Sequence, residues 1–428
     1  MALGGLAVAA SSRQAQKQPE NQPRYIDAYD LGLTHDMLSQ IHGVLKHNYY
    51  DPSFHGLDID ARYQTYMARL DSAKDLLDAY RIIAAYLSGL DDPHTLFIPP
   101  PNSYRVTYGY RAQMIGDRCF VTDVRPGTDA AQKLHPGDQL VSLDGYAVNA
   151  SDLYQLQYYL NLLAPKKITQ LTLRDPQGNV RSVSVESKVK SGPRFVYWVV
   201  GNARMEMDTR QHLLRSRTVE QGSVLFWKLP ALRANEGIDH AFALARKHDI
   251  LILDLRGSYG SDDEVLTSMV GSVFDRDVTI GKKVGRNEEK RWLAKSRGRE
   301  AFSGHLIVLI DSQSASAAEI FARVVQLEHR GTIVGDHSTG SVMDSAPYML
   351  KESQNLTLYY EVLVSVAKPV MADGQSLEKV GVTPDLTVLP TAADLAAGRD
   401  RALARAAELA GVKIDPAANM FPFEWTPD

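Results

Sequence analysis

Cysteine is almost absent from this sequence: Cys119 is the only one in 428 residues. A single cysteine excludes an intrachain disulfide and a cysteine-rich zinc site. Long apolar runs are missing too, since no segment approaches the ~20 apolar residues that a membrane-spanning helix needs. Charge of one sign does not dominate either, because 47 Lys and Arg stand against 51 Asp and Glu, a net charge of −4. The sequence therefore predicts no membrane span and no general attraction to nucleic acid.

What is present is an ordinary globular composition, with 44% apolar and 23% charged residues. These fractions exclude a wholly disordered, collagen-like or disulfide-stapled chain. At roughly 150 residues per domain, the length predicts about three domains.

The N-terminus carries a short run of small residues, LGGLAVAA, at positions 3–10. Its AVA sequence resembles the cleavage site of a secretory signal, although the basic segment that normally precedes such a site is missing. Two interpretations stay open, a signal remnant and a disordered tail, and we leave residues 1–24 out of the fold. The first interpretation gives the expectation of a periplasmic or secreted protein.

Residues 25–103 are predicted to form an N-terminal helical unit. Apolar residues recur at spacings of three and four in successive stretches between residues 30 and 90. The last helix ends in the loop SGLDDPHT, because Gly89 and Pro93 do not continue a helix. This loop carries His94.

Residues 104–190 are predicted to form one strand-rich module. Alternation predicts a strand over 118–124, followed by a turn and a short helix. An amphipathic stretch at 152–163 predicts another helix. Residues 168–187 predict a hairpin that turns at the sequence PQG.

Strands and helices alternate after residue 190, which is typical of an α/β layer. The expected elements are strand 223–230, helix 237–247, strand 249–256, strand 305–310, helix 316–327, strand 332–335 and strands within 356–367. Residues 191–428 are therefore predicted to form an α/β core.

The segment DSQSASAAE, residues 311–319, follows a buried strand and leads directly into a helix. A serine there meets free backbone N–H groups that favour a developing negative charge, but a plain N-cap serine occupies the same kind of position. His94 is the candidate base, because its loop is bounded by glycine and proline. His35 and His42 lie seven apart without acidic or cysteine partners and are interpreted as surface residues. The glycine-containing turn DLRGSYGS, residues 254–261, is either part of an oxyanion hole or a plain turn after a strand.

Five segments in register resemble the C-terminal processing (tail-specific) serine peptidases: LDDPHTLFIPP, DLRGSYGS, SASAAEIFARVVQ, IVGDHSTGS and EKVGVTPDLTV. Residues 109–187 are similar to a PDZ-like module, and an expected final helix over 394–409 resembles the family's ending. The resemblance implies a multidomain α/β fold, with a ClpP/crotonase-like peptidase core, an N-terminal helical unit and an inserted PDZ-like β module.

The resemblance places the nucleophile at Ser316 and the oxyanion hole at the backbone amides of Gly260 and Ala317. Many members use a lysine 25 residues after the serine, but Ser341 stands at that position. The turn also departs from the family pattern of Asn and paired glycines, since it reads GSYGS.

A tricorn-type and chlamydial-type branch of the family uses a Ser–His–Glu triad, whose histidine and glutamate match His94 and Glu378. His94 would take the proton of Ser316 near neutral pH, and Glu378 would fix the tautomer and stabilise the imidazolium. We interpret the protein as a serine endopeptidase that acts through an acyl-enzyme. An inactive family scaffold that binds peptides or an apolar ligand is the alternative.

Three further residues receive smaller roles. Asp92 is expected to orient the His94 loop, Gln326 to support the nucleophile helix, and Glu319 to be a first-turn carboxylate rather than a catalytic group. No metal and no organic cofactor is implied.

The expected partner is a protein or peptide substrate. The PDZ-like module would capture an extended chain or C-terminus by adding it to a sheet edge, near residues 108–110. No nucleic acid partner is expected, and the oligomeric state is not predicted. Because His94 precedes the module while Ser316 and Glu378 follow it, the catalytic unit must be discontinuous in sequence.

Overall fold

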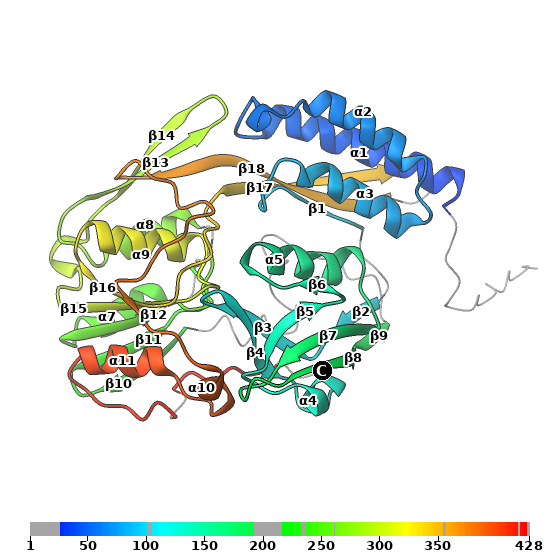
Figure 1. Cartoon of the computed structure of the whole chain (residues 1–428). Helices are drawn as coiled ribbons and strands as arrows, with labels where there is room; N and C mark the ends of the chain where they lie inside the picture. Colours follow the sequence, from blue (N-terminus) through cyan, green and yellow to red (C-terminus); the bar gives the residue numbers. More distant parts are fainter. Residues whose placement is uncertain are drawn as a thin grey trace, which may run out of the picture.

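The computed structural model describes residues 26–100, 104–191, 216–232, 237–260, 262–353, 357–417 and 420–425. It is a mixed α/β protein built of several layers (Figure 1). The tail or signal remnant expected over 1–24 lies outside the described residues. Within the described residues, no helix is both long enough and apolar enough to cross a membrane.

The helices predicted between residues 30 and 90 are confirmed as α1 (Ala28–Asn48), α2 (Ile59–Leu70) and α3 (Leu76–Ser88), with the 3₁₀ turn η1 (Phe54–Gly56) between the first two. Each begins at an aspartate whose side chain accepts a hydrogen bond from a first-turn amide. The helices do not bury a core by themselves. Their apolar faces share one buried cluster with Phe97 and with Tyr360, Val362 and Val364 from far along the chain.

Those partner residues belong to an antiparallel sheet beneath the helices (Figure 1). The sheet contains β1 (Leu96–Ile98), β13 (Val278–Gly285), β14 (Glu289–Ala294), β17 (Asp344–Ser353) and β18 (Thr357–Met371). β1 pairs with β18 at Leu96 and Leu363, so the loop that precedes β1 is held against the C-terminal part of the chain. The sequence predicted strands only within 356–367 of this sheet, because the pattern of the other long strands is less apolar.

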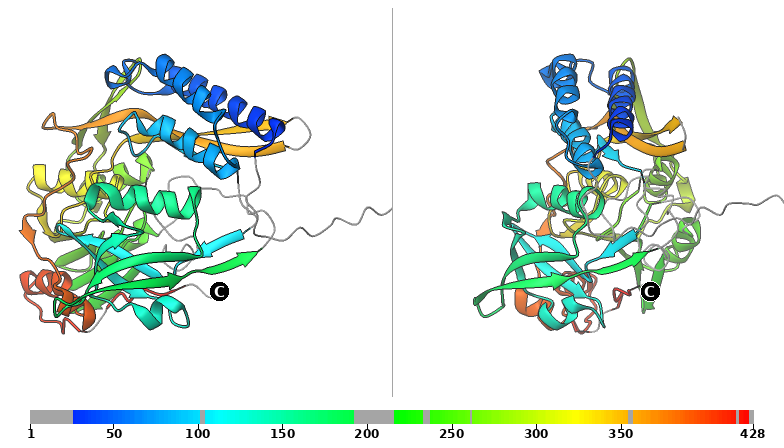
Figure 2. Two further views of the ribbon diagram at one scale, coloured as in Figure 1. Left: turned by 45° about the vertical axis from the view of Figure 1, so that its right-hand side comes forward. Right: turned by 90° about the vertical axis from the view of Figure 1, so that its right-hand side faces the viewer.

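Residues 104–191 have a small core of their own. Figure 2 shows this module as a separate group of strands and short helices below α1 to α3. The main sheet has the order β3 (Tyr110–Ile115), β4 (Arg118–Val124), β5 (Gln139–Leu143), β7 (Ile168–Arg174), β8 (Val180–Glu186), and β6 (Tyr146–Ala147) pairs with β5. β2 (Tyr104–Thr107) pairs separately with β9 (Lys188–Ser191). α4 (Asp129–Lys133) and α5 (Ala150–Tyr158), which continues as a π-helical turn (Tyr159–Leu163), complete the module. The predicted strand over 118–124, the helices and the hairpin are confirmed.

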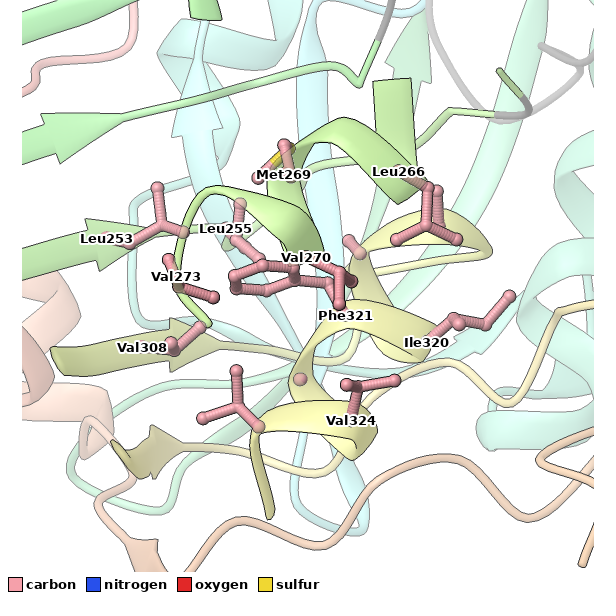
Figure 3. Close-up of a cluster of buried hydrophobic side chains, with 14 of the residues drawn as sticks. Leu253, Leu255, Leu266, Met269, Val270, Val273, Val308, Ile320, Phe321 and Val324 are labelled. Atoms are coloured by element: carbon pink, nitrogen blue, oxygen red, sulfur yellow. The ribbon is translucent and has the colours of Figure 1, made fainter. Parts of the chain in front are cut away.

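The α/β layer is confirmed by a largely parallel sheet. Its order is β10 (Arg217–Gln221), β11 (Val224–Lys228), β12 (Ile250–Asp254), β15 (His305–Ile310), β16 (Gly331–Gly335) and β19 (Leu386–Thr387), and only β10 runs antiparallel. α7 (Ile238–Ala245), α8 (Asp263–Gly271) and α9 (Ala317–Leu327) pack on one face, and the 3₁₀ turn η4 (Gly298–Glu300) precedes β15. Figure 3 shows Phe321 of α9 among Leu255, Val270 and Val273. This packing anchors α9, whose first turn meets the candidate nucleophile.

The expectation of one final helix over 394–409 is wrong. The structure has two helices, α10 (Ala392–Ala396) and α11 (Arg401–Leu409). Gly398 adopts a φ of +63° between them, which ends a right-handed helix, and Asp400 then caps α11 through its side chain. α11 covers the opposite face of the parallel sheet, against Phe226 and Ile307.

Candidate active site

Ser316 occupies the junction between β15 and α9, in a strained backbone conformation. Its φ is 56° and its ψ −120°, a region that residues with a side chain rarely adopt. The flanking Ala315 and Ala317 are buried, whereas Ser316 itself is partly exposed. The serine therefore lies at the N-terminus of an 11-residue helix, where the helix dipole favours negative charge.

The nucleophile loop, residues 311–316, is tied to the turn that follows β12. The Asp311 carboxylate accepts hydrogen bonds from the amide of Gly257 at 2.8 Å and from that of Gln313 at 3.1 Å. The Ser314 hydroxyl donates to the carbonyl of Leu255 at 2.9 Å. The loops after β12 and β15 lie at the same edge of the sheet because the two strands are parallel. These hydrogen bonds hold the two loops together.

Glu319 does more than the first-turn role expected from the sequence. Its side chain is fully buried, and one oxygen accepts from the amides of Ser316 and Ser341, both at 2.9 Å. The other accepts from the Ser338 hydroxyl at 2.6 Å and the Gly340 amide at 2.5 Å. Burial raises the pKa of Glu319 above its usual range, although these hydrogen bonds act in the opposite direction. The carboxyl group fixes the nucleophile loop relative to residues 338–341.

His94 lies in the loop between α3 and β1, where Asp92 holds it. One Asp92 oxygen accepts from the His94 amide at 2.9 Å, and the other accepts from the Thr95 hydroxyl at 2.8 Å. Asp92 therefore contacts the His94 backbone, at the position expected of a residue that orients this loop.

The His94 ring meets Glu378 and Ser341 through one nitrogen. Nε2 lies 2.9 Å from the Ser341 hydroxyl oxygen and 3.5 Å from a Glu378 oxygen. The same Glu378 oxygen accepts from the amides of Val342 and Met343 at 2.9 and 3.2 Å. Burial acts to raise the pKa of Glu378, but His94 and the two amides together lower it below its usual value. Glu378 is therefore ionised at neutral pH and faces the imidazole.

Ser316 joins this group through its backbone. Its amide donates to the carbonyl of Ser341 at 2.9 Å, so the two serines are neighbours. Among the described residues, no hydrogen bond links His94 directly to Ser316. The structure thus brings Ser316, His94 and Glu378 together around Ser341, a residue to which the sequence analysis gave no role despite its position 25 residues after Ser316.

The two residues expected to form the oxyanion hole lie next to each other. The Ala317 amide donates to the Gly260 carbonyl at 3.2 Å, so it is occupied in this conformation. A Cβ at Gly260 would lie 2.3 Å from the Leu232 carbonyl oxygen, which explains why only glycine fits. The Leu232 amide in turn donates to Tyr259 at 2.8 Å.

Gln326 is placed differently from the other predicted site residues. Its side-chain amide donates to the carbonyl of Thr383 and to Asp385, both at 2.9 Å. Gln326 therefore ties the end of α9 to the segment before β19 and supports the nucleophile helix from outside the catalytic group.

A small cavity of about 190 Å³ opens beside Glu378 and is also lined by Asp92 and Met343. Asp91 and Lys379, an ion pair, stand at its border. Within the described residues, no group of three or more His, Cys, Asp or Glu side chains is arranged to hold a metal ion.

Residues 224–388 match the family model described as "Peptidase family S41". Residues 224–388 therefore carry a domain of peptidase family S41. The matched range includes Ser316, Ser341 and Glu378, whereas His94 precedes it. The family resemblance predicted from the sequence is confirmed, and the matches favour a serine peptidase over an inactive scaffold.

Relatives of this S41 peptidase are distant. Carboxyl-terminal-processing peptidase 3, chloroplastic, from Arabidopsis thaliana is 22% identical over 82% of this chain and 68% of its own length. The tail-specific protease of Haemophilus influenzae is 24% identical over 76% of this chain, which spans only 48% of that protein.

Solved structures share the fold of this S41 peptidase. Mature CPAF superposes with a TM-score of 0.64 at 15% identity, covering 86% of this chain and 95% of that one. The photosystem II D1 C-terminal processing protease superposes with a TM-score of 0.52 at 19% identity, covering 83% and 93%.

Proposed function

We propose that this S41 peptidase is an endopeptidase that hydrolyses protein substrates with Ser316 as nucleophile, His94 as base and Glu378 as the stabilising carboxylate. The observation that carries the proposal is their convergence from three distant segments, with Nε2 of His94 3.5 Å from Glu378 and the Ser316 amide bonded to Ser341. The positive φ of Ser316 supports it, because strained backbone of this kind concentrates at catalytic sites.

The reaction would be acyl transfer. The Ser316 oxygen attacks a peptide carbonyl while its proton passes to His94, and the amine leaves with that proton. The ionised Glu378 stabilises the imidazolium by charge, since 3.5 Å is too long for a strong hydrogen bond. Water then hydrolyses the acyl-enzyme by the same path.

The oxyanion would be held by the amides of Ala317 and Gly260. In the conformation described, the Ala317 amide is taken by the Gly260 carbonyl. We therefore expect the peptide at Gly260 to turn when a substrate binds, which frees this donor for the developing negative charge.

We further propose a ClpP/crotonase-like core over 191–428, a helical unit over 25–103 and a PDZ-like insert over 104–190. Substrate capture would use β3, which stands at the edge of its sheet and can accept an added strand. β3 also contacts the nucleophile loop: Gln113 donates to Asp311 at 2.8 Å, and the Ser312 hydroxyl donates to the Met114 carbonyl at 2.5 Å. A chain bound there would lie next to the nucleophile loop, which fits the C-terminal processing named for the relatives.

The test is labelling with a fluorophosphonate probe, combined with casein cleavage. We expect wild-type protein to be labelled, and the Ser316→Ala variant to lose both labelling and cleavage. His94→Ala and Glu378→Gln should slow both, whereas His135→Ala, an exposed histidine of the insert, should match wild type. Labelling that survives in Ser316→Ala would refute the nucleophile, and a protein that takes no label would be a binding scaffold.

We also propose a periplasmic or secreted location, because the small-residue run at positions 3–10 resembles the end of a secretory signal. Fractionation of cells, with the intact mass of the natively produced protein, tests this. A full-length protein in the cytoplasm would contradict it.

A further inference from the structure

Ser341 is a buried serine whose backbone and side chain face different members of the catalytic group. It is 5% exposed and lies after β16, in the segment that Glu319 holds. Its carbonyl accepts from the Ser316 amide at 2.9 Å, and its hydroxyl oxygen lies 2.9 Å from Nε2 of His94. Its own amide donates to Glu319, which also binds the Ser316 amide. One residue therefore stands between the nucleophile and the base.

We propose that the Ser341 hydroxyl is a catalytic proton relay between Ser316 and His94. When the Ser316 oxygen bonds to the substrate carbonyl carbon, its proton moves to the Ser341 oxygen. The proton of Ser341 moves at the same time to the lone pair on Nε2 of His94. The carbonyl electron pair moves onto the substrate oxygen. When this intermediate collapses, a proton passes from His94 through Ser341 to the departing amine. Ser341 gives up one proton and receives one proton in each step, so it remains a neutral hydroxyl.

The charges around Nε2 agree with this direction of transfer. A neutral imidazole protonated at Nδ1 offers its Nε2 lone pair to the Ser341 hydroxyl. The Glu378 carboxylate, 3.5 Å from the same nitrogen, attracts a proton there once it arrives. Both neighbours therefore favour protonation of Nε2. The Ser341 hydroxyl is hydrogen-bonded to this nitrogen, and the Glu378 carboxylate stabilises the positive charge that protonation creates.

The proposal rests on the proposed function, in which Ser316 and His94 carry out acyl transfer. Ser341→Ala is a clean perturbation, because alanine keeps the backbone bonds to Ser316 and Glu319 and removes only the hydroxyl. Ser341→Thr keeps a hydroxyl. The matched control is Ser272→Ala, a fully buried serine directly after α8 whose hydroxyl donates to the carbonyl of Ser268 in the last turn of that helix.

The experiment measures kcat and KM on a fluorogenic casein peptide, with rates in mixtures of H2O and D2O. We expect Ser341→Ala to lower kcat by about 100-fold or more, the size of a proton-transfer contribution, with KM changed less than about threefold. For wild type, a plot of the rate against the deuterium fraction of the solvent should be curved, because two protons move together. For Ser341→Ala the same plot should be linear. Ser341→Thr should restore the curve, and Ser272→Ala should match wild type.

Two results would overturn the relay. One is a Ser341→Ala enzyme with wild-type kcat. The other is a slow Ser341→Ala enzyme that keeps the curved deuterium dependence, since a residue that only positions His94 does not change the number of moving protons. Failure of the proposed function is distinguishable, because Ser316→Ala would then remain active whatever Ser341 does.

Discussion

A buried carboxyl group far from the nucleophile gives a quantitative prediction about stability. Glu361 lies in β18, opposite Ile98 of β1 and Met349 of β17. It is only 3% exposed, and one of its carboxyl oxygens lacks a hydrogen-bond partner among the described residues. Burial raises the pKa of Glu361 from 4.5 to about 7. We predict that Glu361→Gln stabilises the protein at alkaline pH.

The magnitude follows from the shift. One pKa unit is worth 1.36 kcal/mol, so a carboxyl raised to about 7 makes the folded state about 3 kcal/mol less stable above pH 7 than below pH 4.5. The sign is set by proton binding: the folded protein holds this proton more tightly, so stability falls as the pH rises from 4.5 to 7. Glutamine carries no charge at any pH. The difference in unfolding free energy between Glu361→Gln and wild type should therefore rise by about 3 kcal/mol, in favour of the variant, between pH 4.5 and pH 7.

Urea unfolding followed by circular dichroism at several pH values between 4.5 and 8 measures the difference. Glu186→Gln, an exposed carboxyl of β8, is the matched control and should show no such trend. A Glu361→Gln variant whose difference from wild type does not change with pH would contradict this prediction, since the expected gain comes from ionisation of the carboxyl group rather than from packing.

The other predictions concern the active site. Glu319→Gln replaces an acceptor of backbone amides by a group that also donates, so it should lower labelling of the nucleophile at least tenfold and cost about 1–3 kcal/mol of unfolding free energy, measured by probe kinetics and urea titration. Gly260→Ala places a Cβ 2.3 Å from the Leu232 carbonyl oxygen and should lower kcat at least tenfold. The control is Gly43→Ala, at a helical glycine with open space around it, which should leave kcat unchanged and stabilise the folded protein by up to about 1 kcal/mol. Arg111→Ala removes an ion pair between β3 and β4 and a stacking contact that ties β3 to Phe423 of the C-terminal segment. It should therefore raise KM for casein but not for a short peptide, and an equal effect on both substrates would contradict this.

Local sequence patterns were sufficient for many elements. The helices α1 to α3, the hairpin of β7 and β8 and the parallel strands β12 and β15 follow from periodicity, turn residues and apolar runs. The same patterns missed β13, β14 and β17 and merged α10 with α11. These three strands show neither strict apolar–polar alternation nor a continuous apolar run, which are the patterns that predict a strand. The break at Gly398 depends on a left-handed conformation that residue type permits but does not impose.

The residues available for chemistry can be named from the sequence alone: a serine before an alanine-rich helix, a histidine in a short loop, a glutamate near the end, and a serine at the position where many family members have a lysine. Their contacts depend on the folded chain. Pairing of β1 with β18 carries His94 to Glu378, the buried Glu319 sets Ser316 beside Ser341, and the Ser341 hydroxyl, rather than that of Ser316, meets the imidazole. These relations join residues up to 284 positions apart. They depend on packing and on the need of buried polar groups for partners, which no local pattern records.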